Sequence, residues 1–354
     1  MGSGPLEPPN PRRGRLDYLT VGIGIVVIGR NEGQRLRACL ASAARTGLPV
    51  VYVDSGSTDD SLAIARAAGV DTLALDPSRP FTAGRGRNEG FRRLLERKPD
   101  VELVQFIDGD CEMRPGWIEK GVAALSATPR AAAVCGRVRE RFRDATIYNR
   151  LCDLGWELPL GEIDSCGGNA LWRAPVFLKA EGFNPTLIAG EEADLCLRVR
   201  ASGWSVLRVD AEMVLHDAAM TRFAEWWRRG VRVGYAYTEG WYRTARSPER
   251  LWTRETRSTL FWGVFVPLAS FALLLPTSGW SLLALGGYPA LALRVRRQTL
   301  RRGLSPGDAN LYAVFCVLAK FPQALGLLQF VVLRLARRTR PVVDWRSVPR
   351  PKDT

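Results

Sequence analysis

Apolar and polar positions along the first two thirds of the chain follow the pattern of strands and helices in alternation. The apolar runs at 21–28, 50–54 and 103–108 are rich in valine, isoleucine and leucine, as buried parallel strands are. Helical patterns lie at 35–46 and 61–68. This order predicts an α/β fold with a doubly wound, mostly parallel sheet, in which ligands bind beyond the carboxyl ends of the strands.

Farther along, the pattern becomes apolar almost without interruption. Segments 259–277 and 278–293 carry no charge until the arginines that follow them, and the Pro-Thr-Ser-Gly between them is typical of a tight reversal. Together they predict a membrane hairpin, with a buried helix pair of a soluble protein as the alternative. A third apolar stretch, 311–333, is interrupted by Lys320 and Pro322, which predicts a broken or re-entrant segment.

The distribution of charge indicates the kind of binding partner and the orientation of the predicted hairpin in a membrane. Lys and Arg total 50 against 36 for Asp and Glu, giving a net charge of +14, which favours an anionic partner. Arg254 and Arg257 precede the hairpin and five arginines follow it within 294–302. By the positive-inside rule both ends of the hairpin then lie in the cytoplasm.

Between these regions, segment 221–258 interleaves aromatic and basic residues, among them Trp226, Trp227 and Arg229. Such a mixture is typical of an amphipathic helix at a membrane interface. A helix packed on its own domain and a single-strand nucleic-acid binder are the alternatives. Seven scattered cysteines without a CxxC pair indicate neither a zinc site nor a disulfide framework and fit a reducing compartment.

These patterns predict five parts along the chain. They are a flexible tail (1–18), a catalytic α/β domain (19–220), an amphipathic interfacial region (221–258), a membrane hairpin with a broken third apolar segment (259–335) and a basic cytoplasmic tail (336–354).

Acidic residues gather where the predicted strands end. Asp108 and Asp110 flank a glycine after an apolar strand, so their carboxylates fall on one side and invite a hard cation such as Mg²⁺ or Mn²⁺. Asp54 ends another strand, ahead of a small-residue loop where a carboxylate could bind a base or ribose or where the loop could cap the next helix. Glu191 and Glu192 begin a predicted helix, whose dipole should keep them ionised; one of them is a candidate general base, and simple helix capping is the alternative.

The order of five motifs, VVIGRNE, VDSGSTD, GRGRNEG, DGD and GEEADLCLRVRASGW, resembles the inverting family-2 glycosyltransferases with the GT-A fold, over about residues 21–243. The resemblance implies a role for each matching residue in turn. Those that would bind the nucleotide-sugar are Arg30, Glu32, Asp54, Arg87, Asn88 and Asp108, while Asp110 would bind the metal and Glu192 would be the catalytic base.

Further positions follow from the same resemblance. His216, the single histidine, would be a second metal or diphosphate contact, although a structural histidine is the alternative. The acceptor side would be formed by Gly168, Asn169, Glu191, Trp226, Trp227 and Arg229. Glu192 stands where aspartate is more frequent in the family, and the QxxRW motif of processive synthases is absent, which favours transfer of one sugar.

The sequence thus predicts a metal-dependent inverting glycosyltransferase of the inner membrane with a cytoplasmic catalytic domain. Its donor would be a nucleotide-sugar, its cofactor Mn²⁺ or Mg²⁺, and its acceptor a lipid or lipid-linked saccharide, with no nucleic acid expected. A membrane-bound nucleotidyltransferase is the alternative enzyme, although the chain lacks a glycine-rich triphosphate loop with a catalytic lysine. A non-catalytic membrane scaffold or nucleic-acid-binding protein is the third possibility.

Overall fold

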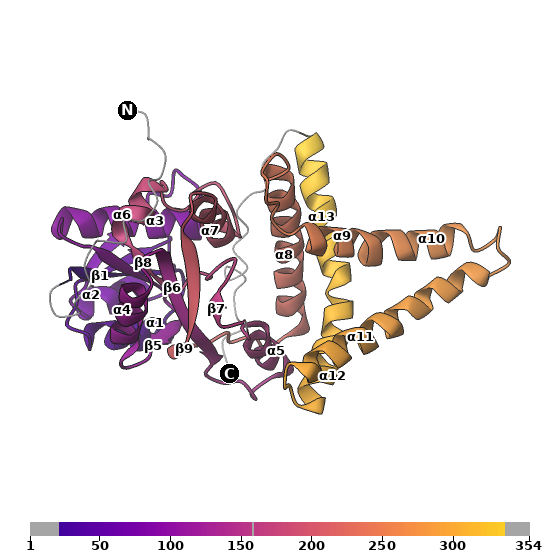
Figure 1. The fold of residues 1–354 in the computed structure, drawn as a ribbon, viewed down its shortest axis with the longest axis horizontal. Coiled ribbons are helices and arrows are strands. Elements are labelled where there is room, and N and C mark those ends of the chain that lie inside the picture. Colours follow the sequence, from indigo (N-terminus) through magenta and orange to yellow (C-terminus); the bar gives the residue numbers. More distant parts are fainter. Residues whose placement is uncertain (1–20, 158, 337–354) are drawn as a thin grey trace. The chain divides into compact units, whose positions relative to one another are not determined.

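The computed structural model describes residues 21–157 and 159–336, which form two compact units (Figure 1). The first unit holds the described residues up to Phe142 together with Trp156–Ala218. The second holds Arg143–Gly155 and the described residues from Ala219 onward. The predicted tails at 1–18 and 336–354 lie outside the described residues, apart from Ala336.

The first unit is an α/β domain. Its strands are β1 (Ile23–Gly29), β2 (Val50–Asp54), β3 (Asp71–Ala74), β4 (Leu103–Asp108), β5 (Cys111–Met113), β6 (Ala131–Glu140), β7 (Gly161–Glu162), β8 (Ala170–Arg173) and β9 (Ser205–His216). Its helices are α1 (Gln34–Ala44), α2 (Ser61–Ala67), α3 (Ala83–Arg97), α4 (Trp117–Ala127), α6 (Ala174–Lys179) and α7 (Glu191–Ala201).

The strands form one sheet in the order β3-β2-β1-β4-β8-β6-β9-β5, with β7 paired to β9. Strands β3, β2, β1 and β4 run parallel to one another, as the apolar runs predict for β1, β2 and β4. The remainder is mixed, because β8 runs antiparallel to both β4 and β6, while β6 and β9 are parallel. The predicted α/β class is confirmed, and the first four strands form the continuous parallel part of the sheet.

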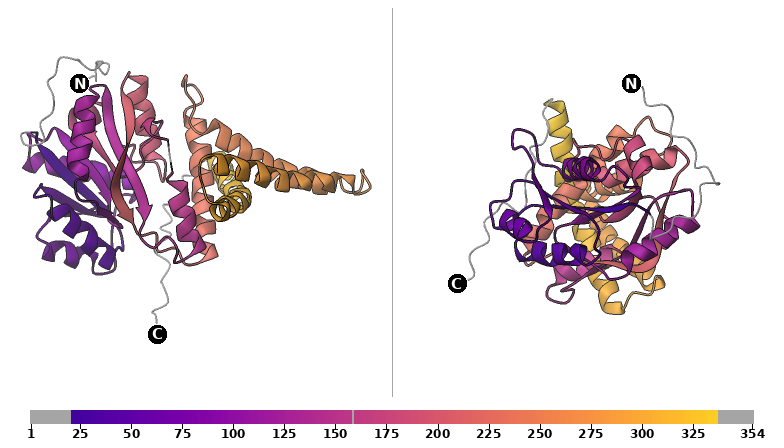
Figure 2. Two further views of the ribbon diagram at one scale, coloured as in Figure 1. Left: turned by 60° about the horizontal axis from the view of Figure 1, so that its bottom comes forward. Right: turned by 90° about the vertical axis from the view of Figure 1, so that its left-hand side faces the viewer.

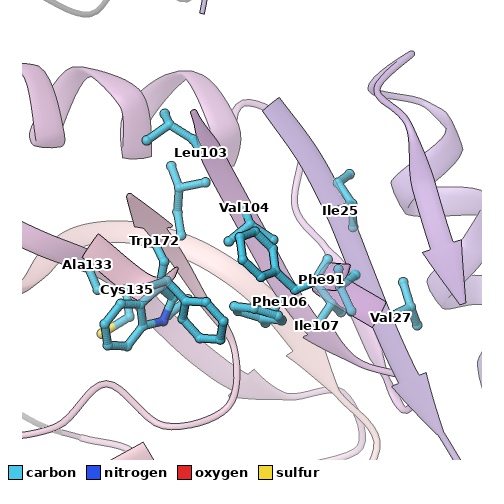
Figure 3. Packing of buried hydrophobic residues seen from close by; sticks show 14 of the residues in the cluster. Ile25, Val27, Phe91, Leu103, Val104, Phe106, Ile107, Ala133, Cys135 and Trp172 are labelled. Atoms are coloured by element: carbon cyan, nitrogen blue, oxygen red, sulfur yellow. The ribbon is translucent and has the colours of Figure 1, made fainter. Parts of the chain in front are cut away.

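Helices cover both faces of this sheet, which explains the nearly continuous apolar strands (Figures 1 and 2). On one face Phe106 of β4 contacts Phe177 of α6, with ring centroids 5.0 Å apart. On the opposite face, the indole of Trp117 in α4 donates to Gln105 Oε1 at 2.8 Å. Figure 3 shows Phe106 and its apolar neighbours from β1, β4 and β8 packed together. This packing makes the strand ends a rigid platform for polar side chains.

The second unit is helical. Its elements are α5 (Ile147–Gly155), α8 (Phe223–Arg243), α9 (Thr253–Leu260), η1 (Phe261–Phe265), α10 (Val266–Ala272), η2 (Trp280–Gly286), α11 (Gly287–Arg301), α12 (Pro306–Leu318) and α13 (Lys320–Leu335). Helix α8, which belongs to the predicted interfacial region, packs closely on α13. A Cβ atom on Gly326 would lie 2.0 Å from the Val231 carbonyl oxygen, and one on Gly234 would lie 2.0 Å from that of Gln323. Small residues therefore let the two backbones meet.

The predicted hairpin is helical on both sides of a turn at 273–279 (Figure 1). Its two arms touch where the Tyr288 hydroxyl donates to the Trp262 carbonyl oxygen at 2.7 Å. Large apolar side chains remain exposed along it, including Leu268 at 65%, Phe271 at 65% and Trp280 at 73%. An exposed apolar surface of this kind marks a site of contact with a membrane or with another protein.

The third apolar stretch forms α12 and α13, which are separated at Ala319, close to the predicted interruption. Within the described residues, the helical stretch Pro306–Leu335 is the one with the length and apolar composition of a membrane span. Apolar C-terminal helices are thus confirmed, while the path of this segment through a membrane stays a prediction.

Candidate active site

Polar side chains gather at the carboxyl ends of β1, β2 and β4. The buried Asp54 carboxylate accepts backbone N–H groups of Gly56 and Ser57 at 2.9 and 2.8 Å, and the Tyr52 hydroxyl at 3.0 Å. The Ser57 hydroxyl donates to the same carboxylate at 2.5 Å. Asp54 therefore fixes the shape of the loop after β2, the place where the sequence predicts a nucleotide contact.

The loop after β1 holds the two other residues predicted to bind nucleotide at this side. Glu32 is buried and pairs with Arg35 at 3.0 Å, and its backbone N–H donates to the Ser61 hydroxyl at 3.0 Å. The Arg30 guanidinium carbon lies 5.3 Å from the centre of the Phe81 ring. The Ser61 contact joins the loop after β1 to the start of α2, and the Phe81 contact joins it to the segment before α3.

Arg87 of α3 is the centre of the acidic part of the site. Its Nη2 lies 2.7 Å from Asp108 Oδ1, and its Nη1 lies 2.8 Å from Glu191 Oε1 and 3.7 Å from Glu192 Oε1. A Cβ atom on Gly168 would lie 2.1 Å from Arg87 Nη2, so the guanidinium needs a glycine there. The buried Arg87 guanidinium thus interacts with three carboxylates, one from β4 and two from α7.

The ionisation of this cluster follows from burial and charge. Burial opposes the charge of Arg87, but Asp108, Glu192 and Glu191 outweigh it and raise the pKa of Arg87, which stays positive. Burial and then the neighbouring Glu191 raise the pKa of Glu192 to about 7, and Arg87 only partly offsets them. The expectation that the helix N-terminus keeps Glu192 ionised therefore needs correction, because burial beside another carboxylate outweighs the dipole.

Two asparagines form hydrogen bonds to backbone groups near Arg87 and Asp108. Asn88 donates from its side-chain amide to the Phe183 carbonyl oxygen at 2.7 Å and accepts the Phe183 N–H at 2.9 Å. Asn169 accepts the Asp108 N–H at 2.9 Å. Both predicted site residues therefore hold the backbone around Arg87 and Asp108.

A second polar group lies where β5 and β9 pair. Potential ligand atoms of Asp110, Cys111 and His216 all lie within 4.8 Å of one another. His216 Nε2 faces Asp110 Oδ2 at 3.6 Å, and His216 Nδ1 lies 2.9 Å from Glu140 Oε2. Burial raises the pKa of the Cys111 thiol well above its ordinary value, so it is a poor ligand for a hard cation.

The residues predicted for the acceptor side fall into both units. Gly168, Asn169 and Glu191 lie beside Arg87 and Asp108 in the first unit. Trp226, Trp227 and Arg229 belong to α8 of the second unit, where Trp226 contacts Phe315 with ring centroids 5.0 Å apart. A role of these three in the same site stays a prediction.

Glu140, which contacts His216, is a residue of the site that the sequence does not predict. No motif marks it, since it is simply the last residue of a strand that ends in Arg-Val-Arg-Glu. Its place is evident only from the register that pairs Glu140 with His216 across β6 and β9.

Comparison with known proteins agrees with this geometry. Residues 24–165 match the family model described as Glycosyl transferase family 2. A pre-mycofactocin glycosyltransferase of Mycobacterium tuberculosis (strain CDC 1551 / Oshkosh) is 24% identical over 220 residues, covering 58% of this chain and 44% of that protein. The succinoglycan biosynthesis protein ExoU of Rhizobium meliloti (strain 1021) is 30% identical over 203 residues, covering 51% of this chain and 57% of that protein.

The fold has solved counterparts too. The mannosyltransferase PcManGT from Pyrobaculum calidifontis, solved in complex with GDP-Man and Mn²⁺, aligns with a TM-score of 0.55 at 17% identity, covering 92% of this chain and 90% of that one. At that identity the likeness shows the fold. The chain spans about half the length of the two curated relatives described above.

The fold, the order of motifs and the family match agree on the class of protein. Residues 24–165 match family 2 of the glycosyltransferases, and the fold is of the GT-A type. The alternatives of a nucleotidyltransferase or a non-catalytic scaffold receive no support from these comparisons.

Proposed function

We propose that the protein transfers a single sugar from a nucleotide-sugar to a membrane-associated acceptor, with inversion at the anomeric carbon and with the help of a divalent cation. One observation carries this proposal. Glu192, whose pKa of about 7 suits a general base, shares Arg87 with Asp108, and Asp108 stands two residues before Asp110 in the sheet of a family-2 glycosyltransferase domain.

The ligand atoms that Asp110 and His216 offer fit Mn²⁺ or Mg²⁺. A carboxylate oxygen and an imidazole nitrogen 3.6 Å apart can both reach one ion at bond lengths of about 2.1 Å. Both side chains are largely buried, at 5% and 14% exposed. When bound, the ion would neutralise the diphosphate as it leaves. Asp110 and His216 would hold it, and the carboxyl end of β4 would orient the donor beside them.

Glu192 would take the proton from the acceptor hydroxyl. A base with a pKa near the working pH combines a sufficient deprotonated fraction with a useful driving force for proton transfer. Arg87 would balance the negative charges of Asp108 and Glu191 and hold both beside the donor. Arg30, Glu32, Asp54 and Asn88 would shape the loops that receive the nucleotide. Attack by the acceptor in a single displacement inverts the anomeric centre.

The helical unit would place the acceptor at a membrane. An open groove of about 550 Å³ runs along α9, η1 and α10, and apart from Arg257 its lining residues are apolar, among them Leu260, Phe265 and Leu268. Arg254 and Arg257 are exposed before the hairpin, as are Arg294, Arg297 and Arg301 after it. The positive-inside rule then supports a hairpin inserted from the cytoplasm. A lipid or lipid-linked saccharide is the acceptor class that such a surface suits.

The test uses the purified full-length protein in detergent or nanodiscs. Thermal stabilisation by UDP, GDP and dTDP sugars, with and without Mn²⁺, identifies the donor. Transfer is then measured with membrane lipid extracts as the acceptor. We expect metal-dependent stabilisation by one nucleotide class and incorporation of its sugar into the lipid fraction. No stabilisation by any donor would contradict the proposal, and labelling of cysteines placed at 294–302 from outside the cell would contradict the orientation.

A further inference from the structure

Glu140 ends β6 in direct register with His216, which ends β9. The Glu140 side chain is fully buried, with an exposed fraction of 0%. Its Oε2 lies 2.9 Å from His216 Nδ1. Burying a carboxylate costs free energy unless hydrogen bonds or charges compensate it, so the partners of Glu140 indicate what it does beside this ring.

The surroundings of Glu140 favour a carboxylate that accepts hydrogen bonds. The Ala218 N–H donates to both of its oxygens, at 3.2 and 3.1 Å, and the Phe142 N–H lies 3.5 Å from Oε1. The other flank of the imidazole contacts the Trp156 ring, with centroids 4.6 Å apart. Glu140 and Trp156 thus hold the ring in one orientation, with Nε2 turned to Asp110.

An ionised carboxylate accepts hydrogen bonds and cannot donate them. The hydrogen bond at 2.9 Å therefore requires the proton of a neutral imidazole to stay on Nδ1. The lone pair is then on Nε2, the nitrogen that faces Asp110 Oδ2 at 3.6 Å. Histidine ligands commonly donate their second N–H to a carboxylate, which sets the tautomer and strengthens the ligand.

We propose that Glu140 is a positioning residue for metal binding: it keeps the proton of His216 on Nδ1 and so presents Nε2, together with Asp110, to the divalent cation. This inference rests on the proposed metal site. It adds a buried carboxylate that is not itself a ligand.

The Glu140→Gln variant keeps the shape of the side chain but changes its hydrogen bond to His216. Its amide oxygen can still accept the Ala218 N–H, but its NH₂ group would then face Nδ1 and donate to it. The proton would move to Nε2, where it opposes metal binding. Glu212→Gln is the matched control, because Glu212 lies on β9, the strand of His216, is 47% exposed and contacts Arg139 at the surface.

His216 is the only histidine of the chain, so ¹⁵N-histidine labelling reports on this ring alone. Long-range ¹H–¹⁵N spectra of the metal-free protein, recorded where the two nitrogen shifts show a neutral ring, identify the tautomer. We expect Nδ1–H in the wild type and in Glu212→Gln, and Nε2–H in Glu140→Gln. A wild-type ring protonated on Nε2 would overturn the inference, whatever the variants do.

Mn²⁺ affinity, measured by the loss of the free-ion EPR signal, is the second readout. We expect Glu140→Gln to bind Mn²⁺ about 10- to 100-fold more weakly, the usual cost of losing a carboxylate behind a ligand, and Glu212→Gln to bind as the wild type does. Equal affinity in Glu140→Gln and the wild type would refute the role of Glu140 while leaving the metal site intact. Failure of the wild type to bind Mn²⁺ would instead remove the metal site itself, and the inference with it.

Discussion

The two units of this protein differ in how they treat large apolar side chains. The first unit buries its large apolar residues between sheet and helices, and it also buries charges, with the Arg87 side chain 3% exposed and that of Glu191 5% exposed. The helical unit leaves Leu268, Phe271 and Leu275 exposed. Buried charge costs free energy unless it is paired, and exposed apolar surface costs free energy in water. The first unit therefore gives up stability to hold paired charges, while the second exposes apolar surface of the kind that a membrane or a partner protein would cover.

The largest expected effect of a single substitution lies in the first unit. Glu192→Gln keeps the size of the side chain but cannot accept a proton, so single-turnover transfer should fall by about 10²- to 10⁴-fold while donor binding persists. Glu119→Gln is the control, since Glu119 is an exposed acid in the first turn of α4. Near-normal transfer by Glu192→Gln would exclude it as the base.

Asp110→Asn tests the metal site. The substitution removes the charge that would hold the cation, so nucleotide affinity and turnover should fall together, by more than the about 10- to 100-fold expected for a residue behind the ligands. Titration of the nucleotide by calorimetry, with and without Mn²⁺, measures the effect. An affinity that still responds to Mn²⁺ as in the wild type would show that the cation binds elsewhere.

The pH dependence of kcat/KM tests the raised pKa of Glu192, which lies beside Arg87. Burial and Glu191 raise the pKa of Glu192 to about 7, and a general base acts in its deprotonated form. Below that pH, kcat/KM should therefore fall about tenfold per pH unit, and it should level off above it. Initial rates at low donor and acceptor concentrations between about pH 5 and 9 measure the profile. A flat profile down to pH 5 would mean that no group with this pKa serves as the base.

The smallest effect is expected from arginine substitutions at two leucines, one in each unit, that are similarly exposed. Leu268 on α10 is 65% exposed and Leu178 on α6 is 61% exposed. Arginine within a bilayer costs about 2.5 to 3.5 kcal/mol, so Leu268→Arg should reduce the carbonate-resistant membrane fraction. Leu178→Arg faces water in the proposed arrangement and should change stability by less than about 0.5 kcal/mol. Equal membrane fractions for the two variants would contradict a lipid-facing α10.

Sequence patterns predicted those parts of the molecule that depend on local order. The strands at Val50–Asp54 and Leu103–Asp108 match their predicted limits, because buried parallel strands are continuous apolar runs with polar ends. The antiparallel insertion of β8 between β4 and β6 was not predicted, since it depends on long-range pairing. Motif order marked Asp110 and Glu192, but the pairing of Glu140 with His216 arises from strand register and has no local signature.

Sequence also failed to predict the electrostatic balance at α7. The acids at its start suggested a helix dipole that keeps them ionised, but the net effect depends on how deeply Glu192 is buried and on the distance of 3.7 Å to Arg87. Neither quantity follows from spacing along the chain. Packing of α8 against α13 through Gly234 and Gly326 was likewise visible only in three dimensions.

The stereochemistry of transfer tests the central claim most directly. With the donor identified by thermal stabilisation, the anomeric configuration of the product is read by NMR from a transfer reaction stopped before the product can react further. A single displacement with Glu192 as the base predicts inversion relative to the donor, with no covalent sugar-enzyme adduct. Retention of the donor's configuration would contradict the account.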